Sequence, residues 1–239
     1  MTTRPDDDLR RVRSAHARLL ETVGGLDDQV ARRPSLLPGW DVAMLVTHLA
    51  RNADGHAGVA EGARGGERRR RYPSPEARDT GIEAGRRRPA AEVADDLRAS
   101  IERLEQAWGT LPLDAWVGVG LSPTDEPEPI AEAPAARLRE VEIHHADLGL
   151  GFTFEDWEAT FVAEELDRWM PGLGVRLPPG VGASVVATDT GRTWTIPTAD
   201  RDGGGAVDVL RVEAPSRALL AWLVGRRTGG LPELGPWGW

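Results

Sequence analysis

The 239-residue sequence contains no cysteine, which excludes disulfide bonds, thiolate metal ligands and a cysteine nucleophile. Any thiol chemistry must therefore come from a bound small molecule. Lysine is absent too, so every basic side chain is an arginine, and together with abundant alanine and glycine this indicates GC-rich coding of an actinobacterial type. The sequence has no run of about 20 apolar residues that could span a membrane, and no apolar N-terminal segment of the kind that directs export. We expect a cytoplasmic protein without a membrane partner.

An excess of positive charge is also missing. The formal net charge of −9 argues against a nucleic-acid-binding surface, which normally has a basic face. The densest basic run, Glu67-Arg68-Arg69-Arg70-Arg71, lies among glycines and precedes Tyr72-Pro73. We interpret this run as a solvated loop, with anion binding as the alternative. The composition, with 40% hydrophobic and 28% charged residues, is ordinary for a globular protein and allows one large or two smaller domains.

The first 150 residues carry the spacing of amphipathic helices, with apolar residues recurring every three or four positions. Asp41 is placed to cap the second of these helices, and Gly149 to stop the fourth. The connections 64–75 and 109–133 are rich in proline, glycine or charged residues and are predicted to be loops. Four such helices in succession predict a helical bundle. Their predicted ranges are 9–23, 42–63, 89–108 and 134–148.

After Gly151 the pattern changes to a mixture of helix and strand. A helix is expected over 154–170, and a last helix from Pro215 to a stop at Gly229-Gly230. Between them we expect three strands, over 185–187, 193–196 and 207–212, with turns at 189–191 and 202–205. The fold class is therefore α+β, with a helical bundle over residues 1–152 and a small α+β domain over residues 153–239.

Only five histidines occur, and two of them suggest a metal site. Glu140 and His144 are spaced i, i+4, so they project from one face of the fourth helix and can reach one ion. His48 is the best candidate for a third ligand, because it lies mid-helix beside Leu45 and Leu49, near the apolar stripe. Each signal alone is weak, since such a pair on a helix is usually a surface pair and a lone histidine near an apolar face is usually a core residue.

A broader pattern supports this site. Four segments carry it: Leu37-Pro38-Gly39-Trp40-Asp41 followed by residues 45–54, Tyr72-Pro73-Ser74 with Arg78-Asp79 and Ile82-Glu83, residues 139–148, and the ending Trp222-Leu223-Val224-Gly225-Arg226. In this order, over nearly the whole chain, they resemble the mycothiol-dependent maleylpyruvate isomerase family. Asp41 stands where relatives often carry threonine or serine, a change that retains the capping function.

The resemblance implies a DinB-like metal-binding four-helix bundle followed by an α+β domain of sterol-carrier-protein-like character. It also implies zinc, or another divalent metal, held by His48, Glu140 and His144, and mycothiol as the thiol cosubstrate. Three protein ligands leave a fourth position open. A thiolate stabilised there would add to maleylpyruvate, the resulting single bond would rotate, and elimination of the thiol would give fumarylpyruvate.

The substrate implied by the resemblance is a dianion, which arginine can bind through two parallel hydrogen bonds. Arg78 and Arg226 lie in segments that match the family and are the candidates for this role. For Arg226 the alternative is a solvated side chain at a helix end. Asn52, one turn beyond His48, is a candidate for hydrogen bonding to substrate or thiol, with a helix-face amide of no special role as the alternative.

The leading functional hypothesis is a zinc- and mycothiol-dependent isomerase of the maleylpyruvate type. A mycothiol-dependent S-transferase for electrophile detoxification is the second, and a non-catalytic metal-binding DinB-like protein is the third. The expected partners are a small thiol and a small dicarboxylate. Trp237 and Trp239 could fold back onto the bundle or contact a partner, so the sequence leaves monomer and homodimer open.

Overall fold

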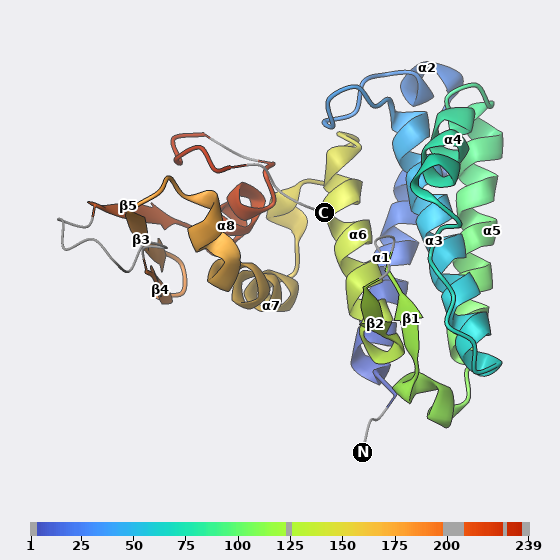
Figure 1. The fold of residues 1–239 in the computed structure, drawn as a ribbon. Helices are drawn as coiled ribbons and strands as arrows, with labels where there is room; N and C mark the ends of the chain where they lie inside the picture. Colours follow the sequence, from blue (N-terminus) through green and yellow to red (C-terminus); the bar gives the residue numbers. More distant parts are fainter. Residues whose placement is uncertain (1–3, 123–125, 198–207, 227–228, 236–239) are drawn as a thin grey trace. The chain divides into compact units, whose positions relative to one another are not determined.

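The computed structural model describes residues 4–122, 126–197, 208–226 and 229–235, and the chain divides into two compact units, Met1–Phe152 and Thr153–Trp239 (Figure 1). The first unit is mainly helical, and the second combines helices with a three-stranded sheet. The predicted α+β class is thereby confirmed. Among the described residues, no helix has the length and apolar character needed to cross a membrane.

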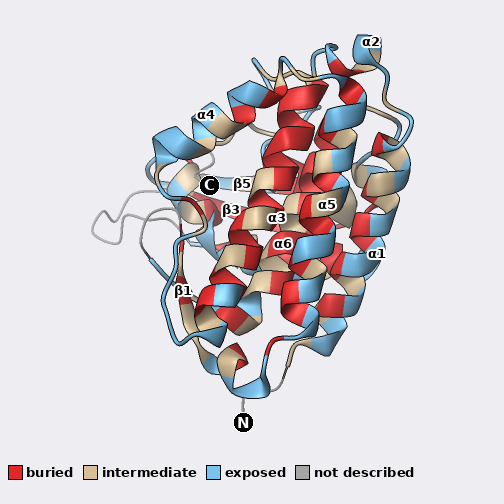
Figure 2. Cartoon of the chain, turned by 90° about the vertical axis from the view of Figure 1, so that its right-hand side faces the viewer, coloured by how far each residue is buried: buried red, intermediate tan, exposed pale blue. Residues whose placement is uncertain are grey.

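The first unit is built on α1 (Asp6–Val23), α3 (Val42–Arg64), α5 (Ala90–Gly109) and α6 (Ala133–Asp147). Both α1 and α3 pack against α5 and α6, so the helices enclose one core. Figure 2 shows buried residues along nearly the whole length of α3, whereas α1 and α5 keep exposed outer faces. The predicted four-helix bundle is confirmed, and α3 is its most deeply buried member.

Local chemistry explains where these helices begin and end. The carboxylate of Asp41 accepts a hydrogen bond from the backbone N–H of Met44 at 2.9 Å, which starts α3 as predicted. Three aspartates occupy the first turn of α1, where negative charge favours the helix dipole. Gly149 follows α6 with a φ of +66°, a backbone conformation that residues other than glycine rarely adopt.

Several short elements were not indicated by the sequence pattern. α2 (Asp28–Ala31) follows α1, and α4 (Pro75–Gly85) begins at the end of the predicted loop, capped by Ser74. The segment predicted as the loop 109–133 contains the antiparallel strands β1 (Val119–Leu121) and β2 (Pro127–Pro129), with the 3-10 turns η1 (Leu113–Val117) and η2 (Ile130–Glu132). These pieces were missed because they are short; in α4, for example, only Ile82 and Gly85 are buried, which leaves no helical periodicity to detect.

The second unit contains a sheet in the order β4-β3-β5. β4 (Thr193–Ile196) pairs antiparallel with β3 (Val181–Ala187), and β5 (Asp208–Ala214) pairs parallel with it, in register from Val181 with Asp208 to Ala187 with Ala214. The remaining elements are η3 (Phe154–Asp156), α7 (Ala159–Trp169), η4 (Met170–Arg176) and α8 (Ser216–Leu223), and α7 packs against α8.

Two predicted helix boundaries in this unit are wrong, and the strands β3 and β5 are longer than the predicted ranges 185–187 and 207–212. The helix expected over 154–170 is interrupted at Trp157, which is extended and fully buried, so α7 begins only at Ala159. The last helix ends at Leu223 instead of at Gly229, because Gly225 adopts a φ of +74° just after the C-cap residue Val224. The predicted turn at 202–205 and the tryptophans at 237 and 239 lie outside the described residues.

Arg137 is fully buried and connects the helices of the bundle through hydrogen bonds. Its Nε donates to His16 Nε2 on α1 at 3.2 Å, and its Nη1 donates to Asn52 Oδ1 on α3 at 2.8 Å and to the carbonyl of Leu49 at 3.0 Å. His16 Nδ1 lies 2.9 Å from the Glu105 carboxylate on α5. Because arginine can only donate, His16 Nε2 must accept, which places the imidazole proton on Nδ1 and directs it to Glu105. One polar chain therefore links α5, α1, α6 and α3.

We expect Gly85→Ala to destabilise the first unit, because an added Cβ would lie 1.8 Å from Thr47 Oγ1 on α3 and force α4 away. The loss in unfolding free energy should be about 1–3 kcal/mol, typical of overpacking. Gly81→Ala is the matched control in the same helix. Its Cβ would meet nothing closer than 3.8 Å, so it should stabilise α4 by up to about 1 kcal/mol. Urea unfolding followed by circular dichroism measures both, and equal effects would contradict the close packing at Gly85.

Stability should also decrease as the pH falls. Burial lowers the pKa of His16 to about 4, although its hydrogen bond to Glu105 opposes the shift. The unfolded chain, in which histidine has a pKa of about 6.5, binds this proton at a higher pH than the folded protein does. As the pH falls from about 6.5 to 4, this one residue therefore lowers the free energy of unfolding by up to about 3 kcal/mol. In urea titrations of metal-free protein, His16→Gln should be less stable at pH 7 but should lose less stability between pH 6.5 and 4.5. An unchanged slope would show that His16 does not titrate in this way.

Candidate metal centre

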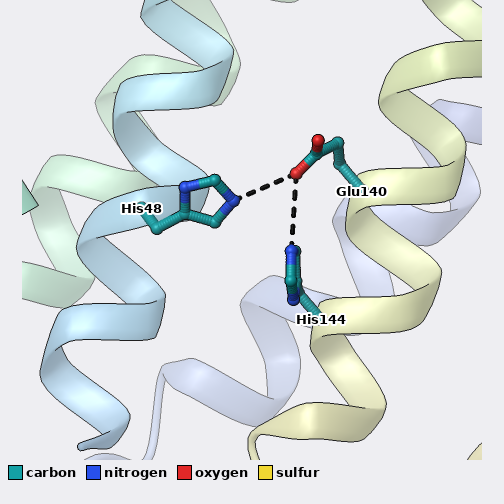
Figure 3. Close-up of side chains that lie close together, drawn as sticks. All are labelled: His48, Glu140 and His144. Carbon is teal, nitrogen blue, oxygen red and sulfur yellow. Dashed lines mark hydrogen bonds and ion pairs between the residues drawn. The ribbon is translucent and has the colours of Figure 1, made fainter. Parts of the chain in front are cut away.

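Three side chains converge between α3 and α6. His48 projects from α3, and Glu140 and His144 project from α6, so that all three point toward one another (Figure 3). One potential ligand atom from each lies within 4.8 Å of the other two. His48 Nε2 lies 3.0 Å from Glu140 Oε2, which lies 3.6 Å from His144 Nε2. The structure thus brings together the three residues that the sequence analysis selected.

The local sequence explains this convergence. Glu140 and His144 are one turn apart, so both face the same neighbour. His48 lies between Leu45 and Leu49, whose side chains are fully buried and hold this face of α3 against the core. The two histidines are themselves nearly buried, with exposed fractions of 4% and 8%. The three groups therefore face one another in a region with little solvent.

The electrostatics leave the site in a form that can bind a cation. Burial lowers the pKa of His48 to about 4, although its hydrogen bond to Glu140 opposes the shift. For Glu140, burial alone would raise the pKa, but the hydrogen bond from His48 and the charges of His48, His144 and Arg137 outweigh it and hold the pKa below its ordinary value. At neutral pH the site therefore offers a carboxylate and a neutral imidazole, the forms that bind metals.

Two supporting residues were missed at the sequence level. His144 Nδ1 lies 2.8 Å from the carboxylate of Asp147, which is 1% exposed. A carboxylate in this place accepts the Nδ1 proton and leaves Nε2 as the ligand atom, the usual support for a metal-bound histidine. The i, i+3 spacing from His144 could have indicated Asp147. Trp40 lies edge-on to the His48 ring, with centroids 5.8 Å apart, and so restricts the rotation of His48.

The residues present fit a divalent metal. Two imidazole nitrogens and one carboxylate oxygen form a donor set that suits zinc and related transition metals. The Nδ1 atom of His48 is buried and has no hydrogen-bond partner among the described residues. The described residues therefore leave one polar atom of this ring unsatisfied. Three protein donors would leave a coordination position for another ligand.

The remaining predicted site residues, Asn52, Arg78 and Arg226, are not part of the three-residue cluster. Asn52 is buried one turn beyond His48, and its side-chain oxygen is occupied by Arg137. Arg78, on α4, pairs with Asp79 at 2.8 Å, lies 5.9 Å from the centre of the Tyr72 ring, and its charge contributes to lowering the pKa of His48. Arg226 belongs to the second compact unit, where its Nη1 donates to the carbonyl of Val224 at 2.6 Å. Its role in the site stays a prediction.

The basic run that was interpreted as a solvated loop is exposed over residues 67–70, and only Arg71 is half-buried. It folds over α3, where a cavity of about 310 Å³ separates it from the helix. Gly55 allows this approach, because a Cβ at that position would lie 2.5 Å from the carbonyl oxygen of Arg71. Five arginines and one tyrosine contribute most of the polar lining: Arg51, Arg69, Arg70, Arg71, Arg78 and Tyr72.

Comparisons with known proteins bear on the fold and on the family of the chain. The chain resembles a crystal structure of the mycothiol-dependent maleylpyruvate isomerase, with a TM-score of 0.84, 24% identity and coverage of 96% of this chain and 94% of the other. It also resembles a histidine-to-alanine mutant of the mycothiol-dependent maleylpyruvate isomerase, with a TM-score of 0.86, 24% identity and coverage of 99% and 100%. These likenesses show a common fold over nearly the whole length.

A more distant likeness covers the bundle. YfiT from Bacillus subtilis, described as a probable metal-dependent hydrolase with an unusual four-helix bundle topology, matches with a TM-score of 0.52 and 18% identity over 61% of this chain and 83% of the other. No curated protein matches the sequence significantly. The family model of the mycothiol maleylpyruvate isomerase N-terminal domain matches residues 12–149, which is more than half of the chain. The chain therefore belongs to the mycothiol maleylpyruvate isomerase N-terminal domain family.

Proposed function

We propose that this protein is a zinc- and mycothiol-dependent isomerase that converts maleylpyruvate to fumarylpyruvate. The observation that carries the proposal is the cluster of the buried His48 and His144 with the half-buried Glu140 in a chain of this family. The likeness in fold to a mycothiol-dependent maleylpyruvate isomerase over nearly the full length supports it. The absence of cysteine is consistent with a sulfur nucleophile that comes from outside the chain.

In this proposal His48, Glu140 and His144 hold the metal, and Asp147 keeps the His144 ring in its ligand orientation. When bound, the metal would supply a position at which the thiol sulfur is stabilised as a thiolate, able to add to the cis double bond and to leave after rotation. His48 enters as a neutral ring, so no proton has to be removed from it at neutral pH. The burial of both histidines keeps bulk water from the centre.

The cavity between α3 and the basic run bears on the choice of substrate, although none of the three candidate ligands lines it. Among the described residues its lining includes five arginines and one acidic residue, Asp54. Arg78 is the lining arginine whose charge also acts on His48, so it is the best placed to bind one carboxylate of a dicarboxylate substrate. Most of the lining surface is apolar, and the arginines are the feature of the cavity that favours a dicarboxylate substrate and hence the isomerase.

We propose that residues 1–152 act as the metal-binding domain and residues 153–239 as a separate α+β domain. We also propose a substrate-binding role for Arg226, which the family pattern of its own segment supports. Asn52 has a narrower role than its position suggested. Because its oxygen is held by Arg137, only its amide N–H groups would donate to a ligand.

Metal binding is tested by substitutions of His48 in α3 and of Asp147 in α6, with a second histidine of α3 as the control. His48→Ala should lower the affinity for Zn²⁺ by more than about 100-fold, because it removes a ligand, and Asp147→Asn should lower it by about 10–100-fold. His56→Ala is the control, since His56 is an equally buried histidine on the same face of α3, two turns away. Competition with a chromophoric chelator measures all four proteins. Retention of zinc by His48→Ala would rule out the ligand assignment.

Activity is tested by following the absorbance of maleylpyruvate with zinc and mycothiol present. We expect isomerisation that requires both and leaves the thiol concentration unchanged. Arg78→Ala should raise KM by about 10–100-fold through the loss of a charge-assisted hydrogen bond. Arg103→Ala, which removes a half-exposed arginine paired with Asp54, is the control and should leave KM unchanged. Consumption of thiol without isomerisation would favour the transferase instead.

A further inference from the structure

Two neighbouring contacts join α3 to α6. In the first, His48 bonds to Glu140 at 3.0 Å; in the second, Asn52 bonds to Arg137 at 2.8 Å. Asn52 lies four residues after His48, and Arg137 lies three residues before Glu140, so each contact is one helical turn from the other. Arg137 and Asn52 therefore form the layer directly next to the candidate metal centre.

Among the described residues, no carboxylate forms an ion pair with the positive charge of Arg137. Its hydrogen-bond partners are the His16 ring, the Leu49 carbonyl and the Asn52 amide, all of them neutral at pH 7. In the part of the chain that the structure describes, its Nη2 has no hydrogen-bond partner, and Arg137 forms no ion pair with a carboxylate. Burial lowers the pKa of Arg137 to about 10, so the guanidinium is still charged at neutral pH.

A buried cation without a direct partner is costly, so its position calls for a reason. Glu140 lies one turn along the same helix, where the Cβ atoms are about 5–6 Å apart, and its charge is the largest one that stabilises the Arg137 cation. Once a divalent metal shares the Glu140 carboxylate, the positive charge of Arg137 is no longer balanced. The loaded centre then carries a surplus of positive charge, which attracts anions strongly because little water screens it.

We propose that Arg137 is a specificity-determining residue that weakens the binding of the metal itself and strengthens the binding of anionic ligands, such as a thiolate, at the open position of the metal. Arg137 also orients Asn52, because a guanidinium can only donate and the amide oxygen must face it. This inference rests on the proposed metal function. It goes beyond that function by assigning the preference for anions to a residue that does not bind the metal.

The test uses the full chain loaded with Co²⁺, whose visible spectrum reports ligand exchange. Arg137→Gln removes the charge while keeping a side chain that can bond to Asn52. Its affinity for Co²⁺ should rise about tenfold, because a repelling charge is gone, and its affinity for thiocyanate should fall about tenfold. The affinity for imidazole, a neutral ligand of the same metal position, should stay unchanged.

Three further variants separate charge from structure. Arg137→Lys keeps the positive charge and should retain both affinities. Asn52→Asp gives Arg137 a carboxylate partner without removing the guanidinium, so it should act like Arg137→Gln even if that variant folds poorly. Arg103→Gln removes a half-exposed positive charge and, because solvent screens it, should change neither affinity.

The outcomes are distinct. If Arg137→Gln or Asn52→Asp weakens Co²⁺, thiocyanate and imidazole binding together, Arg137 is only structural and the inference is wrong. If the thiocyanate affinity does not move in either variant, the charge of Arg137 does not reach the ligand, and the inference is wrong while the metal site stands. If the unaltered protein binds no Co²⁺, the proposed function itself fails, and this inference fails with it.

Discussion

The buried guanidinium of Arg137 is the constraint on which the bundle depends. A charged group without access to water must find its hydrogen bonds inside the protein, and Arg137 finds them on α1 and α3, while His16 extends the chain to Glu105 on α5. The position of Arg137 against Asn52 sets the register of α6 against α3. That register places Glu140 opposite His48, so the bond that stabilises the bundle also determines the spacing of the candidate ligands.

Burial decides the chemistry of the three ligands as much as their identity does. In water, histidine is partly protonated near neutral pH, but the pKa of His48 falls to about 4 because desolvation disfavours the imidazolium. Glu140 behaves in the opposite way, because its hydrogen bond and the surrounding positive charges keep it ionised in spite of burial. Two protonation states favourable to metal binding therefore coexist within one small volume, with Asp147 orienting the third ligand.

Two glycines allow close contacts between α3 and the segments that pack against it. Gly55 admits the arginine-rich loop onto α3, and Gly85 admits α4 against Thr47. Through these two contacts Arg78, Tyr72 and the basic run come to line one cavity beside the helix that carries His48. A segment that is exposed to solvent thereby also contributes arginines to the wall of a cavity.

The sequence by itself determined the α+β class, the bundle helices, the Asp41 cap and the Gly149 stop, because each depends on neighbours within one or two turns. Spacing also paired Glu140 with His144, and the family pattern added His48. Tertiary structure alone decided the Arg137 chain, the contact of Asn52, the short helix α4 and the arginine-lined cavity. These depend on residues 85 or more positions apart, as in Arg137 with Asn52, or on packing of short elements with no periodicity of their own. A local pattern cannot specify which distant side chain will meet a buried charge.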